Sequence, residues 1–200
     1  MTTHSEKASA FAQSHGLVRP QDLAAIGIPR SVLSRMVQGG QLIRISRGLY
    51  ALPERKTSEY AAFAELSKIH PQLTYCLLSA LHFHKLGTQL PHEIWVAIPN
   101  KGYAPVSKHW SLRVVRFSGG AFTEGVEEHC LEGVIIRVTS VAKTIADCFK
   151  YRNKIGLAVA LEALNGAWGN QRVSIDELWH YAGVCRIRNV IRPYLESITL

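Results

Sequence analysis

The sequence predicts an α+β fold in which an N-terminal winged helix-turn-helix precedes a larger, mixed α+β C-terminal domain. Three observations support this prediction. Short helical patterns punctuated by glycine and proline fill the first 40 residues, and a two-strand pattern follows them. A polar, proline-containing break lies at 53–57. Beyond it, the order of helices, a block of strands and further helices favours α+β over a doubly wound sheet.

Three helices are predicted before residue 40. The first covers 5–14 and is closed by Gly16. Pro20 suits the first turn of the second helix, at 21–26, because the N–H that proline lacks has no partner there. Pro29 opens the third helix, at 30–38, and a glycine pair ends it.

The third predicted helix is amphipathic. At about 100° per residue, its apolar side chains share one arc. They are Val32, Leu33, Met36 and Val37. The opposite arc holds Arg30, Ser31, Ser34, Arg35 and Gln38. Arginine pairs with guanine, glutamine pairs with adenine, and serine permits close approach, so we expect this face to bind DNA.

A basic hairpin follows the helices. Residues 41–46 alternate, with Ile43 and Ile45 on one face, and 49–52 returns after a turn at Arg47 and Gly48. Arg44 and Arg47 would lie on the wing and contact the DNA backbone or minor groove. The alternative is a small helical domain with a solvated basic face. Duplex DNA is favoured over RNA, because RNA-binding modules use aromatic platforms on a sheet.

The charge of the chain is concentrated at its start. The 200 residues carry a net charge of +8, of which residues 1–56 contribute +5, residues 57–142 contribute 0 and residues 143–200 contribute +3. A small basic unit suggests a polyanionic partner, although charge alone does not separate DNA, RNA and membranes. No apolar run reaches the roughly 18 residues of a membrane helix. The N-terminus lacks a signal-peptide pattern, so we expect a cytoplasmic protein.

The break at 53–57 predicts two domains, a DNA-binding domain at 1–55 and a C-terminal domain at 56–200. In the second, helices are expected at 58–69 and 74–86 and strands at 93–98, 112–117, 126–131 and 134–138, followed by helices at 141–151, 154–168, 175–182 and 186–198. Ser174 and Glu177 form a predicted capping box, and Pro193 should kink or shorten the last helix.

No residue pattern indicates catalysis, a metal site or a cofactor, so we expect no enzyme. His82 and His84 lie two apart on a helix, point about 200° from one another and cannot share an ion. The acidic residues Glu124, Glu127, Glu128 and Glu132 are expected to form a solvated face. The four cysteines are widely spaced without a CxxC and are interpreted as buried thiols.

Three segments together resemble the AbiEi antitoxin family. The first runs from Gly16 to Leu23, continues through Ile28-Pro29-Arg30 and closes with the run from Arg44 to Tyr50. The second is the run from Cys76 to Gly87, and the third is the run from Val138 to Phe149. The three occur in the family's order, and the resemblance extends over nearly the whole chain.

This resemblance implies the antitoxin of a type IV toxin–antitoxin system, associated with phage defence and partnered with an AbiEii-type nucleotidyltransferase toxin without need of a stable complex. It also implies a repressor that binds its own double-stranded promoter DNA through the winged helix, while the C-terminal domain carries antitoxicity. A second contact surface, to DNA or to a partner, would use the basic residues of the C-terminal helices, with a solvated face as the alternative. These residues are Lys143, Lys150, Arg152, Lys154, Arg186, Arg188 and Arg192.

Two other functions remain open at this stage. A winged-helix transcription factor would sense a ligand in its C-terminal domain, through a pocket lined by aromatics such as Trp95, Tyr103, Trp110 and Trp168. A nuclease delivered to DNA by the winged helix would need a carboxylate–lysine motif on adjacent strands, and the strand beginning at Glu93 has no lysine at the required place.

Overall fold

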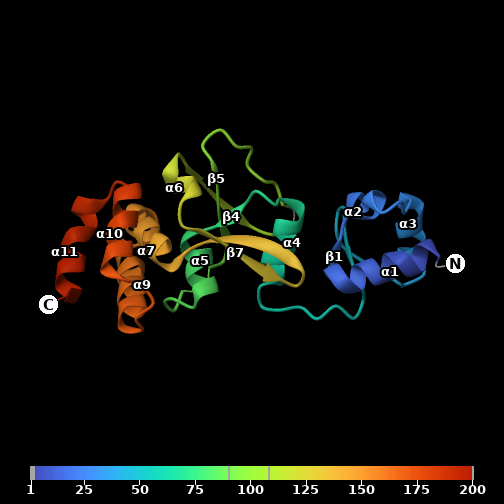
Figure 1. Ribbon diagram of the computed structural model, residues 1–200, viewed down its shortest axis with the longest axis horizontal. Coiled ribbons are helices and arrows are strands. Elements are labelled where there is room, and N and C mark those ends of the chain that lie inside the picture. Colours follow the sequence, from blue (N-terminus) through green and yellow to red (C-terminus); the bar gives the residue numbers. More distant parts are fainter. Residues whose placement is uncertain (1–2, 90, 108, 200) are drawn as a thin grey trace. The chain divides into compact units, whose positions relative to one another are not determined.

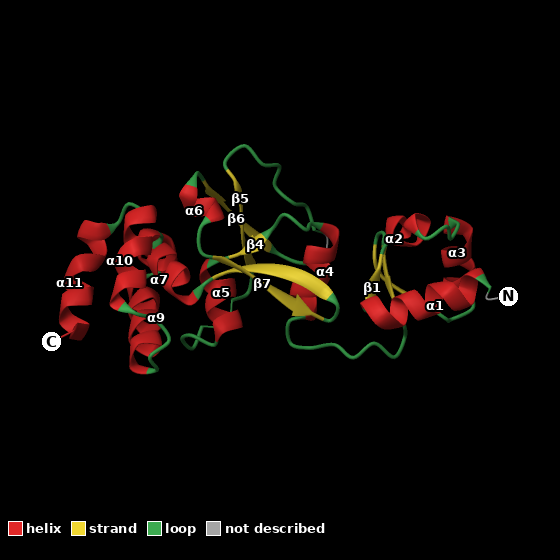
Figure 2. Ribbon diagram, in the orientation of Figure 1, coloured by secondary structure: helices red, strands yellow, loops and turns green. Residues whose placement is uncertain are grey.

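The fold is α+β, as the sequence predicts. Figures 1 and 2 show the computed structural model, which describes residues 3–89, 91–107 and 109–199. The chain forms two compact units. Unit 1 comprises Met1–Pro71 and His129–Ile136, and unit 2 comprises Gln72–Glu128 and Arg137–Leu200. Unit 1 therefore continues beyond the break at 53–57 and includes residues 129–136, which form the tip of a later hairpin. The functional division at 55/56 stays a prediction.

Unit 1 contains the predicted helices and hairpin in the predicted order. Its elements are α1 (His4–His15), β1 (Leu17–Val18), α2 (Pro20–Ala25), α3 (Arg30–Gln38), β2 (Ile43–Ser46), β3 (Leu49–Ala51) and α4 (Ala61–Ile69). The strands form one antiparallel sheet in the order β1-β3-β2. Strand β1 was not predicted, because two residues are too few to show alternation. It adds a third strand to the wing.

A bulge changes the expected faces of the wing. Arg44 pairs with Tyr50 but Ser46 pairs with Leu49, so Ile45 is the extra residue of β2. Leu42 is buried, while Ile43 is 41% exposed. Leu42 and Ile43 differ in burial as the alternation requires, but the alternation expected for 41–46 fails at Ile45, where the bulge interrupts the period of two.

The apolar faces of the helices meet in one core. It contains Ala8, Ala12, Val18, Leu23, Ile28, Val32, Leu33, Met36 and Leu42. A second cluster joins the wing to α4 and to the hairpin tip. It contains Leu17, Leu49, Ala51, Ala64 and Val134. The winged helix thus packs against residues that are distant in sequence but belong to the same unit.

Unit 2 is built on a mixed sheet. Its elements, including a hairpin whose tip belongs to unit 1, are β4 (Thr74–Tyr75), α5 (Leu77–His84), β5 (Ile94–Pro99), β6 (Leu112–Phe117), α6 (Gly120–Thr123), β7 (Val126–Leu131), β8 (Val134–Thr139), α7 (Val141–Lys150), α8 (Arg152–Ile155), α9 (Leu157–Gly169), α10 (Ile175–Val184) and α11 (Arg188–Thr199). The strand order is β6-β5-β4-β8-β7. Strand β4 is antiparallel to β5 and parallel to β8, and β5 is parallel to β6.

Two predicted helices differ from the observed ones. The helix expected at 74–86 begins only at Leu77, because Thr74 and Tyr75 pair with neighbouring strands in the sheet. The helix expected at 154–168 is divided into α8 and α9 at Gly156, whose φ of 95° no right-handed helix permits. Helix α11 continues through Pro193, and the capping box of Ser174 and Glu177 is present on α10.

Helix α7 lies at the centre of the helical core. It packs against α5, α9, α10 and α11 and buries every residue from Ala142 to Phe149. Two of these residues are charged. Lys143 Nζ lies 2.7 and 2.6 Å from the two carboxylate oxygens of Asp147, and both side chains are at most 1% exposed. No helix in the described part of the chain is long and apolar enough to cross a membrane.

Candidate nucleic-acid interface

Helix α3 is fixed by its buried side. Val32, Leu33 and Met36 are at most 2% exposed in the core of unit 1. Pro29 precedes the first turn with extended backbone, and Gly39 caps the end. A helix anchored along one face cannot rotate about its axis without exposing these side chains, so the opposite face has a defined orientation.

The opposite face presents all five predicted contacts. Arg30, Ser31, Ser34, Arg35 and Gln38 are exposed. Within the residues that the structure describes, neither Arg30 nor Arg35 has an ion-pair or hydrogen-bond partner for its guanidinium group. Both arginines are therefore available to bind phosphates or guanine edges without first breaking an internal contact.

The wing adds two more exposed arginines. Arg44 lies on β2, and its Nε donates to the carbonyl oxygen of Ser46 at 3.3 Å. Arg47 lies in the turn before Gly48, whose φ is 79°. Short strands and this turn hold both guanidinium groups on a hairpin, which is the position from which wings contact a DNA backbone or minor groove.

Asp22, a carboxylate of unit 1, is paired with basic side chains. Asp22 accepts hydrogen bonds from Arg19 and lies 3.1 Å from Lys68 Nζ. Burial on its own raises the pKa of Asp22, but these partners outweigh it and hold the pKa below its ordinary value. Pairing reduces the repulsion that a free carboxylate would exert on a nucleic acid.

A guanidinium group that sequence reasoning missed ties the linker to the hairpin tip. Arg55 Nε donates to Glu132 Oε2 at 2.8 Å, and its Nη1 donates to Glu65 Oε1 at 2.9 Å. The other oxygen of Glu132 accepts from the backbone N–H and hydroxyl of Ser58. The expectation that Glu132 lies on a solvated face is wrong, because its side chain is 12% exposed and fully engaged. Glu124, Glu127 and Glu128 are exposed.

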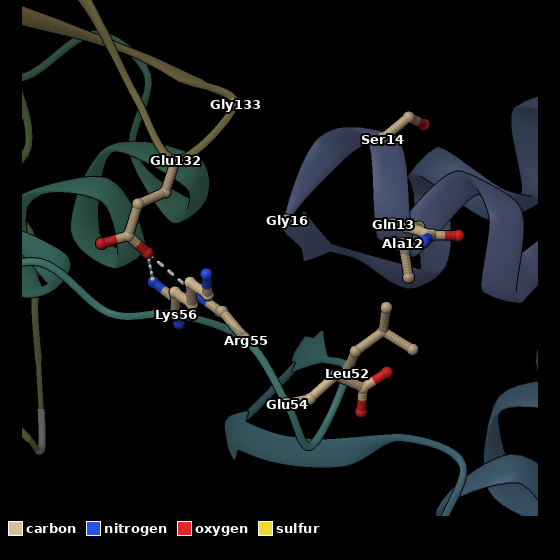
Figure 3. A pocket seen from close by; sticks show the side chains of 10 residues that line it. All are labelled: Ala12, Gln13, Ser14, Gly16, Leu52, Glu54, Arg55, Lys56, Glu132 and Gly133. Carbon is tan, nitrogen blue, oxygen red and sulfur yellow. Dashed lines mark hydrogen bonds and ion pairs between the residues drawn. The ribbon is translucent and has the colours of Figure 1, made fainter.

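Beside this ion pair lies a cavity of about 490 Å³ (Figure 3). It is lined by Ala12, Gln13, Ser14, Gly16, Leu52, Glu54, Arg55, Lys56, Glu132 and Gly133. Partial burial on its own raises the pKa of Glu132, but the hydrogen bonds from Ser58 and Arg55 hold it below its ordinary value. The cavity wall is therefore charged, and its Arg55 and Glu132 are paired with one another. Only the long separation between Arg55 and Glu132 in sequence concealed their pairing.

Residues 6–53, which contain α3 and the wing, match a family model described as a transcriptional regulator, AbiEi antitoxin. The resemblance to the AbiEi family is confirmed over these residues. The match supports a role as an antitoxin or regulator. The fold is similar to the crystal structure of the RV2827C protein from Mycobacterium tuberculosis, with a TM-score of 0.59, 15% identity and coverage of 92% of this chain and 72% of that chain. No curated protein matches the sequence.

The second contact surface expected from the AbiEi resemblance needs one correction. Lys143 is fully buried and paired with Asp147, so it cannot take part in a surface. Lys143 was included because it is basic, and its charge did not show that its side of α7 faces the core. Lys150, Lys154, Arg186, Arg188 and Arg192 are exposed, and Arg152 is partly buried, with its Nη1 donating to the carbonyl oxygen of Phe149 at 3.0 Å. Whether the exposed residues form a contact surface stays a prediction.

Other candidate sites in the chain do not converge. Trp95 is 6% exposed in the core and Tyr103 is 97% exposed, so these two aromatics do not line one pocket. His84 is buried and bonded to the carbonyl oxygen of Thr139 at 2.7 Å. Cys130 on β7 is exposed, contrary to the expectation of four buried thiols. Among the described residues, no group of three or more His, Cys, Asp or Glu side chains could hold a metal.

Proposed function

We propose that the chain is the antitoxin of a type IV toxin–antitoxin system and that it represses its own operon through the winged helix-turn-helix. One observation carries the DNA-binding part of this proposal. The exposed face of α3 bears five donors, while its buried face fixes the helix in the core. The AbiEi match over residues 6–53 supports the same part, because it contains this helix and the wing.

In this proposal α3 enters the major groove of promoter DNA. Arg30 lies in the first turn of α3 and Arg35 in its last turn, and we assign both to guanine edges or adjacent phosphates. Gln38 has the donor and acceptor pair that reads adenine. Arg44 and Arg47 on the wing bind phosphates or the minor groove, and so add affinity that depends little on sequence.

Fluorescence anisotropy with a labelled duplex from the chain's own promoter tests this assignment. Replacing Arg30 or Arg35 with Ala should weaken binding by about 5- to 150-fold, corresponding to about 1–3 kcal/mol for a base contact, and relax specificity at one position. Lys7→Ala is the matched control, because Lys7 is exposed in unit 1 but lies on α1. If both arginine variants bind like the wild type, α3 is not the recognition helix.

Antitoxicity is assigned to the part of the chain outside the DNA-binding domain, acting against an AbiEii-type nucleotidyltransferase toxin. A stable complex with that toxin is not required. The test uses the intact chain with Arg30 and Arg35 both replaced by Ala, co-expressed with the cognate toxin or with a promoter reporter. We expect normal growth and lost repression. A folded double variant that fails to protect would show that antitoxicity needs the DNA-binding face.

A ligand-responsive transcription factor is the second candidate, and the cavity in unit 1 favours it. Its wall includes Arg55 and Glu132, so an occupant would alter the ion pair that holds the linker (Figure 3). The same co-expression assay separates the two functions. If the chain gives no protection against the toxin and its promoter binding changes when a small molecule is added, the result refutes the antitoxin function and supports the ligand-responsive one.

A further inference from the structure

The loop between β5 and β6 is long and carries exposed rings. Figure 1 shows it as a wide arch that leaves the end of β5. Tyr103 is 97% exposed, Val106 is 83% exposed and Trp110 is 37% exposed. Aromatic rings this exposed add little to the core. Their position on a loop is typical of a binding surface.

Hydrogen bonds hold both ends of this loop. Arg116 Nη1 donates to the carbonyl oxygens of Asn100 at 2.8 Å and Gly102 at 2.7 Å. A turn closes between the Gly102 N–H and the carbonyl oxygen of Pro99 at 2.8 Å. At the other end, Ser107 Oγ accepts from the backbone N–H of Trp110 at 3.0 Å. Because the backbone beside Tyr103 is already ordered, binding through its ring incurs a smaller entropic cost.

The segment around the loop is uniformly basic. Residues 99–118 contain four Lys or Arg and no Asp or Glu. Lys101 is exposed two residues before Tyr103. Arg113 lies over the Trp95 ring at 5.6 Å from its centroid, and its nearest carboxylate is that of Glu93, 4.0 Å away. This combination of exposed rings and cations favours a polyanion that also has flat apolar faces.

We propose that this loop binds single-stranded nucleic acid, with an unpaired base stacked on Tyr103 and a neighbouring phosphate bound by Lys101. A base within a duplex keeps both faces stacked on its neighbours, so only an unpaired base can lie against a protruding ring. The loop belongs to unit 2 and is separate in sequence from α3. The inference therefore goes beyond promoter recognition and does not depend on it.

The test measures binding of the intact chain to short fluorescein-labelled oligo(dT) and oligo(U) strands by anisotropy. Tyr103→Ala should weaken binding to these strands by at least about five-fold, because stacking on one ring contributes on the order of 1–3 kcal/mol. Tyr103→Phe keeps the ring and should bind like the wild type, while Tyr103→Leu should behave like the Ala variant. Lys101→Ala should reduce the salt slope by about 0.7, because one phosphate is then no longer bound.

Binding to the promoter duplex serves as the internal control. We expect Tyr103→Ala to leave it unchanged, whereas Arg35→Ala weakens it without affecting the single strands. The proposal is overturned if the wild type binds oligo(dT) and oligo(U) no better than the Tyr103→Ala variant does. It is also overturned if Tyr103→Leu binds the strands as well as the wild type does, because apolar contact without stacking would then suffice. Binding of the loop to anionic lipid vesicles or to a protein in place of the single strands would overturn it as well.

Discussion

Replacing Lys143 with Met should destabilise unit 2 strongly, because it removes the counter-ion of a buried carboxylate. Asp147 is fully buried, and the ammonium of Lys143 lies within 2.7 Å of both its oxygens. The thiol of Cys185 donates to Asp147 Oδ1 at 3.2 Å, and a thiol is a weak donor that cannot replace an ammonium. Burial raises the pKa of Asp147, and the Lys143 ammonium opposes this.

The size of the effect follows from the protonation of Asp147. Without the ammonium, the buried carboxyl takes up a proton in the folded state, and the cost is that of protonating a group with an ordinary pKa of 3.8. At pH 7 this is at most about 4 kcal/mol, because each pH unit costs about 1.36 kcal/mol and the pKa of Asp147 is already raised in the wild type. At pH 5 it falls to about 2 kcal/mol. Because the pKa of Asp147 in the folded variant is raised above its unfolded value, the loss of stability grows as pH rises.

Urea unfolding followed by circular dichroism, at both pH values, measures this loss. Lys150→Met is the matched control, because Lys150 lies on the same helix but is exposed. The double variant Lys143→Met/Asp147→Leu should recover most of the stability, because replacing both ions of a buried pair with apolar groups is often neutral. An equal loss at pH 5 and pH 7, or a double variant less stable than Lys143→Met, would refute the reasoning.

Three further predictions concern unit 1. Replacing both Arg44 and Arg47 with Ala should weaken binding to all DNA sequences alike and lower the salt slope by about 0.9 for each phosphate that is no longer bound, and an unchanged slope would remove the wing from the interface. The pKa values of Asp22 and Glu132 are lower in the folded state than their ordinary values, so both carboxylates stabilise the fold above the ordinary carboxyl pKa, and this stability is lost as pH falls through the folded pKa values. Glu132→Gln should therefore make the melting temperature, measured by calorimetry, fall less steeply at acid pH. Gly16→Ala should cost more in urea unfolding than Gly40→Ala, because both have positive φ but only a Cβ at Gly16 meets a backbone oxygen, at 2.5 Å, and equal costs would argue against that close approach.

The sequence by itself determined most of the local elements. Glycine and proline placed the ends of α3, and its period of 3.6 residues separated the buried Val32, Leu33 and Met36 from the exposed Arg30 and Arg35. The α+β order followed for the same reason, since propensity and periodicity act over a few neighbouring residues. The AbiEi resemblance was likewise a property of linear segments.

Only the tertiary structure decided which contacts join distant residues. Arg55 and Glu132 are 77 residues apart, and no local pattern marks them as partners. Strand β4 shows its identity only in the sheet, because Thr74 and Tyr75 gain backbone partners from β5 and β8. The side of α7 that holds Lys143 faces the core because other helices pack around it. Burial depends on everything that surrounds a residue in space, whereas a sequence pattern records only its neighbours along the chain.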